Sequence, residues 1–170
     1  MSSYTNWSNY WDDLSVKNKK VLHQTNGNKK YFQLEMEELI FGTAKSLPGK
    51  TDGPFVIFSG FIDRISFNDA EKTKREMMLF FMHSIGVDGF SEIPEAKTAT
   101  REVCVDFISK LKKDSNEGID PVAWSFQTGS NVSILPAEYK ISNIIYVGWQ
   151  LVLELNLLDD FCFNADNWNL

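Results

Sequence analysis

The sequence has few of the residues on which acid–base catalysis and metal binding usually depend. Among 170 residues there are two histidines, His23 and His83, and two cysteines, Cys104 and Cys162. Two cysteines are too few for a disulfide framework, and neither a CxxC pair nor an HxxxH pair occurs to bind a metal. The first residues also lack the basic region and apolar run of a signal peptide. We therefore expect no metal, no cofactor, and a protein kept in a reducing compartment.

Long apolar runs and clusters of basic residues are missing as well. No stretch of about 18 apolar residues occurs, so the sequence predicts no membrane-spanning helix. Lysine and arginine number 17 against 23 aspartates and glutamates, which gives a net charge of −6. Because nucleic-acid binding requires clustered lysine and arginine, this balance argues against it. Neither a membrane nor a specific nucleic-acid sequence is expected as a partner.

The chain is instead rich in apolar and aromatic residues, in a pattern that predicts one α+β domain. Hydrophobic residues make up 43% of the chain and aromatic residues 14%. Helical periodicity or β-branched and aromatic content defines each predicted element. Helices are predicted over residues 3–14, 32–47 and 94–113, and strands over 55–67, 74–85, 122–135 and 144–157. This order predicts an antiparallel sheet that packs helices on one face.

We divide the chain into three parts on this basis. Residues 1–30 comprise the aromatic helix and a lysine-rich linker, residues 31–157 form the α+β domain, and residues 158–170 form a C-terminal docking tail. The strand over 74–85 is apolar on both faces, with Met77, Leu79 and Phe81 alternating with Phe80 and Met82. A sheet with one wet side does not need this, so we expect both of its sides to be covered.

The few chemically reactive side chains favour packing over catalysis. His83 lies in an apolar strand face, and His23 lies in the lysine-rich loop, where we expect it to be exposed to solvent. Cys104 falls beside the buried stripe of the helix over 94–113, where a free thiol ordinarily acts as a small hydrophobe. Nothing assembles a nucleophile, a base and a group that orients them. We expect no enzyme, although a pocket near His83 and Cys104 remains an alternative.

Aromatic residues gather at both ends of the chain, outside the strand pattern. Two interpretations are open, since these ends either fold back on their own domain or reach neighbouring copies. The two-faced strand favours the second, because aromatic side chains supply much of the energy of interfaces. The predicted interface residues are Trp7, Tyr10, Trp11, Phe161, Phe163 and Trp168.

Several segments resemble small proteins encoded in the tail gene clusters of Bacteroidetes phages and contractile injection systems. The likeness covers residues 30–168 and rests on loose, mainly hydrophobic motifs. They are Tyr31-Phe32, Glu37-Glu38-Leu39-Ile40-Phe41-Gly42, Gly53-Pro54-Phe55, Phe80-Phe81-Met82-His83, residues 107–114, Gly148-Trp149-Gln150-Leu151, Phe161-Cys162-Phe163 and residues 166–168.

The resemblance implies a structural protein similar to tail terminator and tail completion proteins. Such proteins assemble into a ring, commonly of six copies, that caps the tube and sheath of a tail or joins the tail to the head. It implies tube, sheath or neck proteins as partners, a place in a virion or tail-like particle assembled in the bacterial cytoplasm, and no catalytic residues. An α+β domain with an apolar ligand pocket and an acidic adaptor or immunity-type module remain as alternatives.

Overall fold

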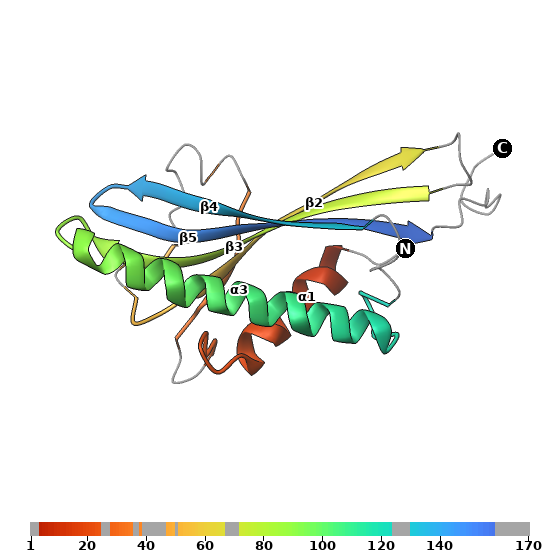
Figure 1. The fold of residues 1–170 in the computed structure, drawn as a ribbon, viewed down its shortest axis with the longest axis horizontal. Coiled ribbons are helices and arrows are strands. Elements are labelled where there is room, and N and C mark those ends of the chain that lie inside the picture. Colours follow the sequence, from red (N-terminus) through yellow and green to blue (C-terminus); the bar gives the residue numbers. More distant parts are fainter. Residues whose placement is uncertain are drawn as a thin grey trace, which may run out of the picture.

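A five-stranded mixed sheet with two helices on one of its faces makes up the described part of the chain (Figure 1). The structure is a computed structural model, and it describes residues 4–24, 28–35, 38, 47–49, 51–66, 72–123 and 130–158. The elements are α1 (Tyr4–Lys17), β1 (Tyr31–Gln33), β2 (Phe55–Ser66), β3 (Lys72–Gly86), the short 3-10 helix η2 (Phe90–Glu92), α3 (Ile93–Asn116), β4 (Asn131–Ile141) and β5 (Ile144–Leu158).

The sheet has the order β1-β2-β3-β5-β4. β2 with β3, β3 with β5, and β4 with β5 are antiparallel pairs, whereas β1 joins β2 in parallel. The predicted α+β class with helices on one face is therefore confirmed, and the sheet is mixed rather than wholly antiparallel. The long helix and the β2–β3 hairpin lie close to the residues predicted for them.

The prediction of a helix starting at Phe32 is wrong, because the chain forms strand β1 there. Tyr31 and Phe32 are each 4% exposed and pack into clusters on opposite faces of the sheet. A three-residue strand buried on both faces gives no alternation of apolar and polar residues, so its sequence cannot be told from the first turn of a helix. Most of the predicted helix after Glu35 lies outside the described residues.

The strand predicted over residues 122–135 is displaced in the structure. Val122 lies in a turn, and β4 runs from Asn131 to Ile141 through Pro136, which we had interpreted as the end of the strand. Proline is tolerated here because β4 is an edge strand, and the missing N–H group removes no bond of the sheet when it faces outward.

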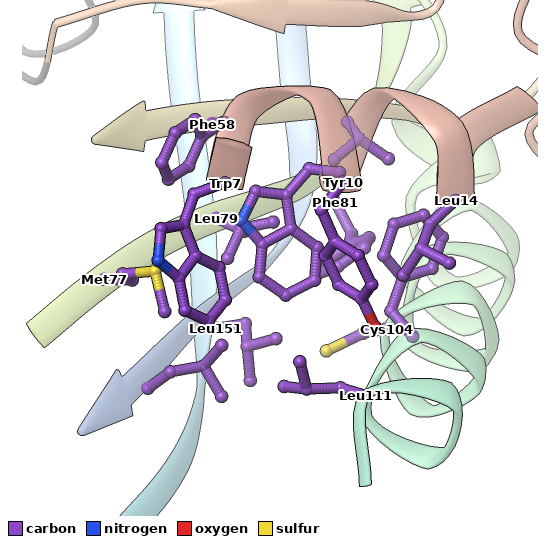
Figure 2. Close-up of a cluster of buried hydrophobic side chains, with 14 of the residues drawn as sticks. Trp7, Tyr10, Leu14, Phe58, Met77, Leu79, Phe81, Cys104, Leu111 and Leu151 are labelled. Atoms are coloured by element: carbon purple, nitrogen blue, oxygen red, sulfur yellow. The ribbon is translucent and has the colours of Figure 1, made fainter. Parts of the chain in front are cut away.

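Aromatic side chains of α1 form the centre of the larger core, between the sheet and α3 (Figure 2). Trp7 and Trp11 are completely buried and stacked, with their ring centroids 5.9 Å apart. Trp11 also stacks on Phe107 of α3, at 6.5 Å. The core further contains Tyr10, Leu14, Val56, Phe58, Met77, Leu79, Phe81, Val103, Cys104, Leu111, Leu151, Leu153 and Leu155.

This burial corrects the prediction that Trp7, Tyr10 and Trp11 form a surface for other copies. All three pack inside their own chain, so the N-terminal helix is part of the domain core rather than a separate segment. The physical reason is that a helix with one aromatic stripe completes the apolar face of the sheet that α3 leaves uncovered. Phe161, Phe163 and Trp168 lie outside the described residues, so their role stays a prediction.

The opposite face of the sheet holds a second apolar cluster, which includes Phe55, Ile57, Phe80 and Met82. Leu47 packs against it, and the neighbouring segment is fastened by hydrogen bonds. The hydroxyl of Tyr146 donates a hydrogen bond of 2.9 Å to the carbonyl of Pro48. The hydroxyl of Ser84 donates one of 2.5 Å to the carbonyl of Gly49. Apolar residues thus cover part of each face, as the two-faced strand predicted.

Gly148 allows β5 to approach β3 closely at the middle of the sheet. A Cβ atom at this position would overlap the carbonyl oxygen of Phe81 and lie 3.0 Å from the Cα atom of Met82. Both neighbours are backbone atoms of the central strand, so neither has a flexible side chain that moves aside. Any larger residue must push the two central strands apart.

We expect the substitution Gly148→Ala to lower the free energy of unfolding by at least about 2 kcal/mol through this overlap. Urea denaturation measures the change. Gly86→Ala is the matched control, because a Cβ atom on Gly86 meets nothing within 4 Å and should leave stability nearly unchanged. Equal stabilities of the two variants would contradict the close approach.

We expect Trp11→Ala to lower the free energy of unfolding by about 3–5 kcal/mol, the usual cost of removing a buried tryptophan. Val16→Ala is the control on the same helix, because Val16 is 42% exposed and alanine favours helices. A stable Trp11→Ala monomer with lost assembly would instead restore the interface interpretation of this residue.

Candidate functional site

The structure places Cys104 where a reactive thiol cannot act. Cys104 is completely buried in the core between α3 and the sheet. Burial raises the pKa of its thiol to about 12, so the nucleophilic thiolate does not form near neutral pH. His83 is half-buried on β3, and its Nδ1 atom lies 3.2 Å from the carbonyl oxygen of Ser84. The predicted role of Cys104 as a packing residue is confirmed.

A groove across α3 has both charged and apolar walls. Its volume is about 430 Å³, within the usual range for ligand sites. Lys97, Arg101 and Val105 follow one another at intervals of four residues on α3 and line one side. The other lining residues are Lys20, Thr98, Glu102, Asp106 and Trp149. We call this surface the α3 groove.

Trp149 is held at the floor of the α3 groove by two contacts with the helix. Its indole N–H donates a hydrogen bond of 2.8 Å to the carbonyl of Lys97. The guanidinium of Arg101 lies 5.6 Å from the centre of the indole ring, a cation–π distance. These contacts fix the ring of a half-buried tryptophan beside an exposed positive charge.

The lysines of the α3 groove already have carboxylate partners. Lys20 lies 3.2 Å from both Glu102 and Asp106, and Lys97 lies 3.5 Å from Glu138 of β4. The hydrogen bond of Lys20 to Asp106, followed by that to Glu102, raises the pKa of the Lys20 ammonium group. No described carboxylate forms an ion pair with Arg101. Among the described residues, the groove therefore offers an apolar floor and the guanidinium of Arg101 as a cation without a carboxylate partner.

Sequence reasoning missed this groove because each of its residues has an ordinary explanation in isolation. Lys97 and Arg101 read as the solvated face of a helix, and Trp149 as one more inward residue of a strand. The detectable signal was the spacing of Lys97, Arg101 and Val105 along one side of the helix. Only the packing of α3 on β5 brings that side to Trp149.

A second, polar pocket surrounds His23, which the sequence wrongly predicted to be exposed. His23 is 5% exposed, between two residues with positive φ angles, Leu22 at 55° and Gln24 at 61°. Its Nδ1 atom accepts a 2.8 Å hydrogen bond from the backbone N–H of Lys30, and its Nε2 atom lies 2.9 Å from Asp12. Nδ1 therefore closes the loop on Lys30 and Nε2 faces Asp12 of α1, so neither nitrogen is available as a general base.

Two more buried polar links fasten α1 to the rest of the domain. The hydroxyl of Tyr10 donates a 2.9 Å hydrogen bond to the carboxylate of Asp114 on α3. Asp114 is 2% exposed, and it also accepts a hydrogen bond from Lys110. Tyr31 of β1 donates to the carbonyl of Ser8 at 3.1 Å. Burial raises the pKa of both tyrosines, so their hydroxyls stay protonated and keep donating.

Neither a metal cluster nor a membrane span is found in the described ranges. No three His, Cys, Asp or Glu side chains among them lie close enough together to hold a metal ion. No helix there is long and apolar enough to cross a membrane.

Comparisons with known proteins do not assign the chain to a family. No family model, curated protein or solved structure gives a significant match. The function must therefore be argued from the geometry of the described residues.

We expect the protein to lose stability as the pH falls from 7 toward 5, through the protonation of His23. Burial lowers the pKa of this histidine below 6.5, so the unfolded chain takes up the proton first and is stabilised relative to the folded chain. The loss begins near the unfolded pKa and ends below the folded pKa. His23→Gln should reduce this pH dependence of the unfolding free energy.

Two measurements test this expectation. Urea denaturation at several pH values compares the wild-type and His23→Gln chains, with the values at pH 8 as the reference. NMR titration of the two histidines gives the folded pKa directly. A folded pKa of His23 above its ordinary value would contradict the prediction.

Proposed function

We propose that this chain is a structural subunit that assembles into a homo-oligomeric ring. In line with the resemblance of its sequence, the ring would cap or terminate the tube or sheath of a phage tail or contractile tail-like particle, or join the tail to the head. The observation that supports this proposal best is the exposed edge strand β4. The enzymatic alternative has less support, because Cys104 is buried and the α3 groove is lined by neither Cys104 nor His83.

β4 presents a long strand edge on which another chain can pair. It has 11 residues, and Ala137 is its only fully buried side chain. β5 pairs with one side of β4 and no described strand pairs with the other side, so within the described residues the outward N–H and C=O groups can pair with a partner. Val132 is 38% and Leu135 is 47% exposed, which adds apolar area beside the edge.

The two edges of the sheet differ, and this favours a ring over a simple dimer. β1, at the other edge, has three residues, whereas β4 has 11. If β4 docks on a different surface of its neighbour, the contact is head-to-tail, and repeated head-to-tail contacts with a fixed rotation close into a ring. A contact of β4 with β4 would instead give a closed dimer.

We expect native mass spectrometry of the purified chain at micromolar concentration to show a discrete ring, of six copies if it follows the proteins that the sequence resembles. Negative-stain images should show the shape of the ring. Monodisperse monomers or dimers that also fail to bind purified tube or sheath ends would refute the proposal.

We further expect Val132→Pro to weaken ring assembly at least about tenfold, because a second proline removes another outward donor from the strand edge. In an antiparallel pair, successive N–H groups point alternately toward the neighbouring strand and away from it. Pro136 has no N–H group to donate to β5, so the even-numbered residues of β4, Val132 among them, direct their N–H groups away from β5. Val132→Thr is the matched control that keeps the donor. Circular dichroism and melting confirm that both variants fold, and equal assembly of the two would contradict a role of the β4 edge.

A further inference from the structure

We propose that the α3 groove binds residues 159–170 of a neighbouring copy of this chain. The inference rests on the proposed assembly and names the contact that links one subunit to the next. All lining residues of the α3 groove lie within the described ranges. The chemistry of residues 159–170 follows from their sequence.

The chemistry of the α3 groove fits an acidic and aromatic peptide. Arg101 is exposed beside the ring of Trp149, and no described carboxylate pairs with its guanidinium. Val105, 42% exposed, adds apolar surface one helical turn further along α3. An aromatic side chain stacked on this floor would place a nearby carboxylate within reach of Arg101, and a volume of about 430 Å³ accommodates it.

Residues 159–170 have the complementary composition. They contain three aspartates, Asp159, Asp160 and Asp166, and no lysine or arginine. They also contain Phe161, Phe163 and Trp168. Opposite charge on the two surfaces speeds and orients the encounter, while buried aromatic side chains supply most of the binding energy.

The length of β5 favours a neighbouring copy over the same chain as the source of the segment. β5 continues nine residues beyond Trp149 to Leu158, which is roughly 30 Å at about 3.4 Å per residue. Trp168 follows ten residues later, so a fully extended chain spans at most about 35 Å. To return to its own groove, the segment would have to reverse and stretch to nearly its full length. A segment from another copy has no such restriction.

A contact of this kind would also have the geometry that a ring needs. The groove and the segment are different surfaces, so each copy gives one and receives one. Such a heterologous contact does not stop at two copies, and it closes when the rotation between neighbours returns to the start.

Photocrosslinking in the full chain tests which copy supplies the segment. The chain carries Trp168→benzoylphenylalanine, and copies labelled with ¹⁵N are mixed with unlabelled copies before assembly and irradiation. We expect crosslinked peptides that join a light and a heavy copy, with the acceptor residue between positions 97 and 106 of α3. Crosslinks that join only peptides of one copy, or that reach other elements, would overturn the inference.

A peptide titration tests the chemistry of the groove without relying on assembly. A fluorescein-labelled peptide of residues 159–170 is added to the full chain, and its anisotropy is measured. We expect Arg101→Glu to raise the dissociation constant at least about tenfold. Lys112→Glu is the matched control, because it changes the charge of α3 equally at an exposed residue outside the groove. Equal weakening by both variants, or no binding, would overturn the inference.

The outcomes separate this inference from the proposed function. Rings whose crosslinks fall outside α3 would overturn the groove contact and leave the ring standing. A monomer in native mass spectrometry, with peptide still bound at the groove, would overturn the ring while supporting the groove as a peptide site.

Discussion

The pairing of β3 with β5 is the constraint on which the rest of the structure depends. Both strands have 15 residues, and they pair along their full lengths, from Lys72 with Leu158 to Gly86 with Ile144. Since side chains alternate across a strand, a shift by one residue would exchange the two faces of the whole sheet. Gly148 is required within this pair, because a Cβ atom at this position would overlap the backbone of Phe81.

The apolar character of both faces follows from this central pair and decides how the other elements are used. Met77, Leu79 and Phe81 of β3, with Leu151, Leu153 and Leu155 of β5, form a floor for α1 and α3. Phe80 and Tyr146 belong to the cluster on the other side. The tryptophans of α1 fill the space beside α3, and so most of the unusual aromatic content near the N-terminus stabilises the monomer. In the assembly that we propose, the apolar surface on β4 and in the α3 groove contacts other chains.

Polar and titratable groups in this protein mainly hold elements together. His23 joins a loop to Asp12 and Lys30, and Tyr10 joins α1 to Asp114. The hydrogen bonds of His23 with Lys30 and of Tyr10 with Asp114 satisfy buried polar groups that would otherwise cost free energy. Arg101 differs from these residues, because its charge lies at the surface beside an aromatic ring. This contrast is why the α3 groove, and not a histidine or cysteine, is the candidate site.

The sequence by itself determined the α+β class, the long helix, the β2–β3 hairpin, strand β5 and the alternation of β3, because strong periodicity reflects local geometry. It did not determine that Phe32 lies in a strand or that β4 passes through Pro136, since both depend on a place at the edge of the sheet. The sequence left open whether Trp7 and Trp11 pack in their own domain or contact other copies. The structure places both in the core of their own chain. For the α3 groove, the sequence contained only the spacing of Lys97, Arg101 and Val105, because Arg101 and Trp149 meet only when α3 packs on β5, a contact between residues distant in the chain.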